Sequence, residues 1–174
     1  MLTHAYEGGH PDHDAAAFAV RAALALLAAR GAPVPAAAEF PSYHARGPAM
    51  VFGRFLPGGP RARAARLSPE EHALKRQMLD CFATQRAVIA RFPTHTERFR
   101  PAPDYDFRRP PHPGRLLYER FGWGMTGKEW RALARAATRT LGLAAPAPRP
   151  PARGETGDAT TAAHAARSRP HAHA

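Results

Sequence analysis

The chain is poor in cysteine, in lysine and in long apolar runs. Its single cysteine, Cys81, excludes a disulfide within the chain, and we expect it to be a small core residue of a helix. The most apolar stretch, residues 15–29, is interrupted by Arg21 and falls short of the roughly 20 apolar residues of a membrane span. No basic and then apolar leader follows Met1. We therefore expect a cytoplasmic protein with no membrane partner.

Basic charge dominates the composition, although Lys75 and Lys128 are the only lysines. The formal net charge is +11, and the arginines are spread along the chain rather than grouped. Nucleic-acid binding depends on grouped cations that neutralise neighbouring phosphates, so this spread argues against a nucleic acid as the partner. A basic anion-binding module stays open as an alternative function.

The end of the chain differs in composition from the rest. Residues 144–174 consist of proline, alanine, arginine and small polar residues, without a large apolar side chain. Such a segment cannot bury enough surface to offset the entropy lost on ordering. The sequence therefore predicts a folded domain over residues 1–143 and a disordered tail over residues 144–174.

The first part of the chain has the pattern of an α/β domain. A strand over residues 2–6 leads into Gly8 and Gly9, and a helix over residues 15–30 follows and is closed by Gly31. Strand, loop and helix form the repeating unit of α/β folds. Beyond them we predict two short strands, at residues 34–40 and 50–56, with a loop at residues 41–44 between them. An exposed connection is predicted to follow at residues 57–66.

The second part of the chain contains two helices with clear start signals. Ser68 and Glu71 form a capping box, and the helix they start is predicted to reach Arg91. Its expected buried stripe is Leu74, Met78, Phe82 and Ile89. Residues 93–124 lack a period, and such a segment is typically either functional or wrapped over the core. Thr126 and Glu129 start a last helix that ends at Gly142, with an expected apolar face of Trp130, Leu133, Ala137 and Leu141.

The motif that indicates chemistry is Gly-Gly-His-Pro-Asp-His-Asp at residues 8–14. His10 and His13 are three residues apart where a loop enters a helix, so both rings can lie near one reacting centre. Asp12 can orient a ring by accepting its second N–H. The same spacing is also typical of a solvated loop, and the spacing alone leaves both interpretations open.

Residues 3–15 resemble the second active-site motif of the PIG-L/LmbE family of zinc-dependent N-acetyl-sugar deacetylases. Similar stretches follow as far as residue 143, at Gln85 and at residues 97–100, 105–107, 111–114, 117–119, 122–124 and 141–143. The resemblance implies an incomplete Rossmann-like three-layer α/β sandwich. It also implies hydrolysis of an N-acetyl group from a small-molecule amino-sugar conjugate.

The resemblance assigns roles to the motif. His13 is implied to be a Zn²⁺ ligand, and His10 to stabilise the oxyanion and protonate the leaving amine, with Asp12 holding an imidazole. The early His-Pro-Asp-Asp motif of the family has no counterpart here, so the other ligands and the general base have no candidate. We therefore expect the C-terminal part of such a domain, with weak Zn²⁺ binding, and a catalytically inactive remnant is the alternative.

Four further residues are candidate substrate contacts. They are Tyr6, Glu7, Arg98 and His112, and for each a structural role is the competing interpretation. His44, His72 and His95 have no distinguishing context and are expected at the surface.

Overall fold

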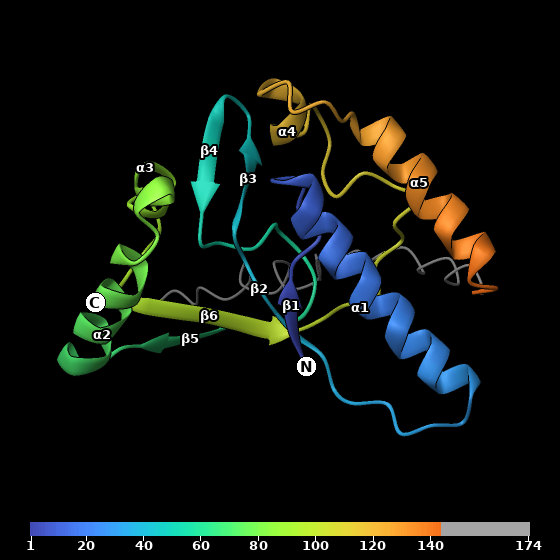
Figure 1. The fold of residues 1–174 in the computed structure, drawn as a ribbon, viewed down its shortest axis with the longest axis horizontal. Coiled ribbons are helices and arrows are strands. Elements are labelled where there is room, and N and C mark those ends of the chain that lie inside the picture. The colour runs from blue at the N-terminus through green and yellow to red at the C-terminus, as the bar shows by residue number, and fades with distance from the viewer. Residues whose placement is uncertain (144–174) are drawn as a thin grey trace, which may run out of the picture.

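The computed structural model describes residues 1–143 and shows a mixed α/β fold (Figure 1). The tail predicted over residues 144–174 lies outside the described residues. Strand β1 (Leu2–His4), helix α1 (Pro11–Ala29) and strand β2 (Ala38–Phe40) form a parallel β-α-β unit in which Leu2 pairs with Ala38. The predicted succession of strand, loop and helix is confirmed.

The sheet continues from β2 with antiparallel strands. Strand β6 (Thr96–Pro101) pairs with β2, and β5 (Arg63–Arg66) pairs with β6, which gives the order β1-β2-β6-β5. A separate hairpin is formed by β3 (Tyr43–Arg46) and β4 (Ala49–Phe52). The sheet is therefore mixed. Its parallel pair, β1 and β2, lies at one edge of the sheet, and the histidine motif follows β1 in the chain.

Several predicted strands and loops were wrong. The strand predicted over residues 34–40 is confined to β2, because Pro35 has no N–H for a ladder. The loop predicted over residues 41–44 already contains the start of β3. The supposed connection 57–66 holds β5, and the supposedly irregular segment 93–124 holds β6 and helix α4 (Leu117–Arg120). The last two strands depend on each other, since Arg66 pairs with Thr96.

The starts predicted for the two helices with capping boxes are confirmed, whereas α1 begins at Pro11 and not at residue 15. In helix α2 (Pro69–Asp80), Ser68 Oγ accepts from the N–H of Glu71, and the Glu71 carboxylate accepts from the N–H of Ser68. Helix α5 (Gly127–Thr140) has the same reciprocal cap between Thr126 and Glu129. These caps form because each needs only two residues of one turn.

The predicted buried stripe of the middle helix was wrong. Helix α2 ends at Asp80 and is followed by a 3₁₀ turn (Ala83–Gln85) and the short helix α3 (Arg86–Ile89). Leu74, Met78 and Phe82 are each more than half exposed, and Cys81 is exposed as well. Helices α2 and α3 lie beside β5 and β6, at the far end from α1 and α5 (Figure 1). Helical periodicity was present here, but three of the four residues that carry it, Leu74, Met78 and Phe82, are exposed in the described part of the chain.

Two apolar clusters lie on either side of the motif loop. One joins α1 to α5 through Tyr6, Ala17, Trp130 and Ala134. The other joins the β3–β4 hairpin to α4 through Tyr43, Ala45 and Leu117. The predicted apolar face of α5 is narrower than expected, because Leu133 and Leu141 are exposed. Tyr6 and Tyr43 thus hold the two flanks of the loop that carries His10.

None of the helices described is long and apolar enough to cross a membrane. The longest, α1, is rich in alanine and has Arg21 in its middle.

We predict that Gly9→Ala destabilises the fold more than Gly31→Ala. A Cβ at Gly9 would overlap the backbone carbonyl oxygen of Tyr43, whereas a Cβ at Gly31 meets no atom and costs only its left-handed conformation, with φ at +65°. The Gly31 change should cost about 1 kcal/mol. Thermal unfolding of both variants measures the difference, and equal losses would contradict the close approach of Gly9 to β3.

Candidate functional site

The loop at residues 8–9 is closed by the buried carboxylate of Asp14. Its Oδ1 accepts hydrogen bonds from the N–H of Glu7 at 3.1 Å and of Gly8 at 3.0 Å. Burial raises the pKa of Asp14 to about 8, although both amide hydrogen bonds act in the opposite direction. The carboxyl group therefore ties the end of the strand segment to the first turn of α1.

Later segments of the chain hold the same loop from outside. The N–H of Leu117, at the start of α4, donates to the Gly8 carbonyl at 2.9 Å. The indole N–H of Trp130 in α5 donates to the Pro11 carbonyl at 3.1 Å. The motif is thus fixed by groups more than a hundred residues away in sequence.

His10 is the N-cap of α1. Its Nδ1 accepts a hydrogen bond from the N–H of Asp12 at 3.1 Å. An accepting Nδ1 places the proton of the neutral ring on Nε2, which is then a hydrogen-bond donor. The Asp12 carboxylate is highly exposed and lies 3.8 Å from His10 Nδ1. Asp12 is therefore positioned to accept from His10 only when the ring carries a second proton.

His13 lies in the first turn of α1, half-buried between other rings. Its ring centroid is 5.2 Å from that of His10 and 5.4 Å from that of Tyr43. Burial, together with His4 and His10, lowers the pKa of His13 to about 4. The ring is therefore neutral at pH 7, and its buried Nδ1 has no hydrogen-bond partner among residues 1–143.

His4, at the end of β1, is a member of the site that sequence reasoning missed. Its ring stacks on that of His13 with centroids 4.1 Å apart and planes 4° apart. Its Nδ1 forms a hydrogen bond with Ser42 Oγ at 3.0 Å. Burial and His10 lower the pKa of His4, so two neutral rings are stacked here. The only sequence signal was that β1 runs directly into the motif.

These rings fit a zinc site in part. A neutral imidazole with an unpartnered nitrogen is a suitable ligand, and His13 meets that condition. His4 cannot join it on one ion, because the lone pairs of two parallel stacked rings lie in separate planes and do not converge. Within the described part of the chain, no three His, Cys, Asp or Glu side chains are grouped so as to hold a metal.

A buried acid and histidine lie under the loop. Glu7 is buried, and its Oε1 accepts from the N–H of Ser42 at 2.6 Å. Its Oε2 is 3.4 Å from Nδ1 of His44. The prediction that His44 is a surface residue was wrong, because the buried Glu7 carboxylate needs a neighbour able to carry positive charge.

The remaining predicted contacts fall in different places. His112 lies against the loop, since a Cβ added to Gly8 would be 3.4 Å from its Nε2, and its Nδ1 donates to the Pro113 carbonyl. Tyr6 is packed in the core, and its hydroxyl donates to the Arg109 carbonyl at 2.9 Å. Arg98 is on β6 opposite Ala64. The structure therefore brings His112 to the motif, and it places Tyr6 and Arg98 elsewhere.

A second buried polar network lies under the sheet and was not predicted. Arg100 Nε donates to Glu39 Oε1 at 2.6 Å, and the Tyr105 hydroxyl donates to the same carboxylate. Burial raises the pKa of Glu39, while Arg100 and Tyr105 favour its ionised form. The network joins β2 to β6 and includes none of the motif residues.

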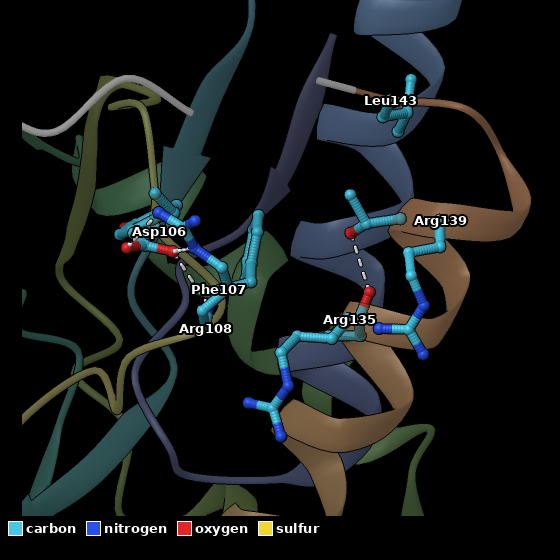
Figure 2. Close-up of a pocket in the computed structure, with 9 residues that line it drawn as sticks. Asp106, Phe107, Arg108, Arg135, Arg139 and Leu143 are labelled. Atoms are coloured by element: carbon cyan, nitrogen blue, oxygen red, sulfur yellow. Dashed lines mark hydrogen bonds and ion pairs between the residues drawn. The ribbon is translucent and has the colours of Figure 1, made fainter. Parts of the chain in front are cut away.

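A hollow of about 240 Å³ lies between residues 105–108 and α5 (Figure 2). Phe107 faces α5 across it, and Arg135 and Arg139 extend from the helix. Arg108, on the opposite wall, is already paired with the Asp106 carboxylate at 2.7 Å. None of the residues lining this hollow belongs to the motif, so the candidate site is assigned by its chemistry and not by volume.

No protein-family model, curated protein or solved structure matches the chain. The assignment of the site depends on the residues and on their geometry.

We predict that His13 of the metal-free protein titrates near pH 4, well below the ordinary histidine pKa of 6.5. Because its pKa in the folded state lies below the ordinary value of 6.5, its contribution to stability is complete above pH 6.5 and is lost as the pH falls through 4. NMR titration of the histidine ring protons measures the pKa of His13. A normal titration of His13 would contradict the buried three-ring arrangement.

We predict that Asp14→Ala lowers the free energy of unfolding by about 1–3 kcal/mol, because two buried amides lose their acceptor. Asp14→Asn keeps one acceptor oxygen and should lose less. Chemical denaturation of both variants checks the order. A larger loss for asparagine than for alanine would contradict the proposed role of the Oδ1 acceptor.

Proposed function

We propose that the chain carries the histidine part of a zinc-dependent N-deacetylase site of the PIG-L/LmbE type. The substrate is an N-acetylated amino-sugar conjugate. The observation that carries the proposal is the pair of His10 and His13, whose ring centroids lie 5.2 Å apart at the start of one helix. One ring has an available neutral nitrogen for a metal, and the other has an Nε2–H for a developing negative charge.

The position of the motif in the fold supports this proposal. In open α/β sheets, ligands bind beyond the carboxyl ends of parallel strands. The motif follows the carboxyl end of β1, which is parallel to β2. The proposal accordingly places these strands in a larger Rossmann-like three-layer sandwich, of which residues 1–143 form a part.

Hydrolysis of the acetamide joins a water oxygen to the acetyl carbon and breaks the carbon–nitrogen bond. When bound, zinc lowers the pKa of a water molecule and polarises the carbonyl group. Neutral His10 stabilises the tetrahedral oxyanion by donating its Nε2–H. To protonate the leaving nitrogen, His10 must first carry a second proton on Nδ1, where the Asp12 carboxylate at 3.8 Å is its nearest acidic partner.

The other candidates receive roles that match their positions. Glu7 and Tyr6 support the loop through Ser42 and the core. His112 lies beside Gly8 with a buried, unpartnered Nε2, which suits a substrate contact. No contact among the described residues supports such a role for Arg98. The remaining metal ligands and the carboxylate that takes the proton of water are assigned to no residue in 1–143.

We predict that zinc-dependent release of acetate from N-acetylglucosamine conjugates, measured with Zn²⁺ in large excess, requires a segment that supplies the remaining ligands and the carboxylate in addition to residues 1–143. His10→Ala should lower kcat by about 10²-fold or more, because it removes a positioned acid and oxyanion donor. His13→Ala should abolish the zinc dependence by removing the available ligand. Acetate release and zinc content are both measured.

The matched control is His95→Ala, which removes an exposed imidazole far from the motif in sequence. It should leave both quantities unchanged. Acetate release that survives both motif substitutions would refute the assignment of roles. Zinc held through His13 without acetate release would identify the inactive alternative.

A further inference from the structure

An exposed pair of aromatic rings lies directly beside His10. The ring centroid of Trp123 is 4.9 Å from that of His10, with planes inclined by 45°. Trp123 in turn stacks on Phe121, with centroids 5.1 Å apart and planes 18° apart. Both residues belong to the turn after α4, where the N–H of Trp123 donates to the Tyr118 carbonyl. Phe121 and Trp123 together are called the aromatic platform below.

The platform differs from the other aromatic groups of the site by its exposure. Trp123 is 42% exposed and Phe121 is 54% exposed. The second tryptophan, Trp130, is only 6% exposed and its indole N–H is bonded to the Pro11 carbonyl. No hydrogen bond within residues 1–143 uses the indole N–H of Trp123. Core packing therefore explains Trp130, whereas Trp123 remains 42% exposed between the rings of Phe121 and His10.

The chemistry of this corner suits a ligand that is apolar on one face and polar at its edge. A flat aromatic surface packs well against apolar groups, while an indole N–H and an imidazole provide hydrogen bonds at its rim. A pyranose ring has this character, because its C–H groups can form one apolar face while its hydroxyl and acetamide groups project from the edge. An acyclic amide would leave most of the platform uncovered.

We propose that the aromatic platform binds the pyranose ring of the N-acetyl amino-sugar and so places the acetamide beside His10. This inference rests on the proposed function, and it adds Trp123 as the residue that selects a sugar. The short distance between the Trp123 and His10 rings supports it, because the acetamide nitrogen is one bond from the pyranose ring. A sugar stacked on the platform therefore carries its scissile bond to the histidine pair.

Tryptophan fluorescence tests the platform without any catalysis. The chain has two tryptophans, and the buried Trp130 provides an internal reference that a surface ligand does not reach. We expect N,N′-diacetylchitobiose to change the emission of the full chain in a saturable manner. Trp123→Ala should remove that change, and Trp123→Phe should weaken binding by about 2- to 10-fold, as the loss of one aromatic contact implies.

Matched variants and ligands make the test specific. Phe82→Ala removes an equally exposed ring on a distant segment and should leave binding unchanged. Circular dichroism confirms that each variant is folded, and calorimetry follows binding to Trp123→Ala, where the fluorescent reporter is lost. Cellobiose, which lacks acetamide groups, should bind more weakly than diacetylchitobiose.

The outcomes separate the platform from the proposed function. Unchanged emission of the wild-type chain, or full binding by Trp123→Ala in calorimetry, would overturn the platform. Equal binding of cellobiose would overturn the placement of the acetamide, and binding of a nucleoside monophosphate in place of both sugars would overturn the ligand class. Sugar binding through Trp123 without any zinc-dependent acetate release would refute the deacetylase assignment alone, whereas acetate release that is independent of His10 would refute only the role given to His10.

Discussion

The candidate site depends on the carboxyl group of Asp14, which closes the glycine loop onto the first turn of α1. Two amides that would otherwise be buried without acceptors, those of Glu7 and Gly8, are satisfied by one oxygen atom. This closure sets the direction in which α1 leaves the sheet. It therefore determines that His10 is the N-cap and that His13 faces back toward His4 at the end of β1. Without it, three histidines close in sequence would have no reason to share one environment.

Local features of the fold could be predicted from sequence, and long-range ones could not. The caps at Ser68 and Thr126 form because both partners belong to one turn. Whether Leu74 and Met78 are buried depends on a partner surface that periodicity does not describe, and both remain exposed. The same reason explains why β5 was not predicted. Its four residues have no alternating pattern, and they form a strand only by pairing with β6, which follows some thirty residues later.

The site shows the same division. His10 and His13 could be paired from sequence because a helical turn brings them together. The contact of His112 with the loop could not be predicted, because it depends on a distant segment that packs against Gly8. The N–H of Leu117, the first residue of α4, donates to the Gly8 carbonyl and so holds that segment in place. His4 and His44 were missed because a histidine in a short strand gives no pattern of its own. Their burial follows from Ser42 and Glu7, which are polar partners supplied by other segments.

The capping role of His10 also constrains what chemistry it can perform. As long as Nδ1 accepts from the N–H of Asp12, the ring is a neutral donor through Nε2 and can stabilise an oxyanion without prior proton transfer. Adding a proton to Nδ1 breaks that cap and moves the ring toward the Asp12 carboxylate, which is exposed and screened by water. Trp123 packs against the same ring, with centroids 4.9 Å apart. Within the proposed deacetylase site, this geometry favours oxyanion stabilisation as the primary task of His10, with proton delivery following only when the helix cap opens.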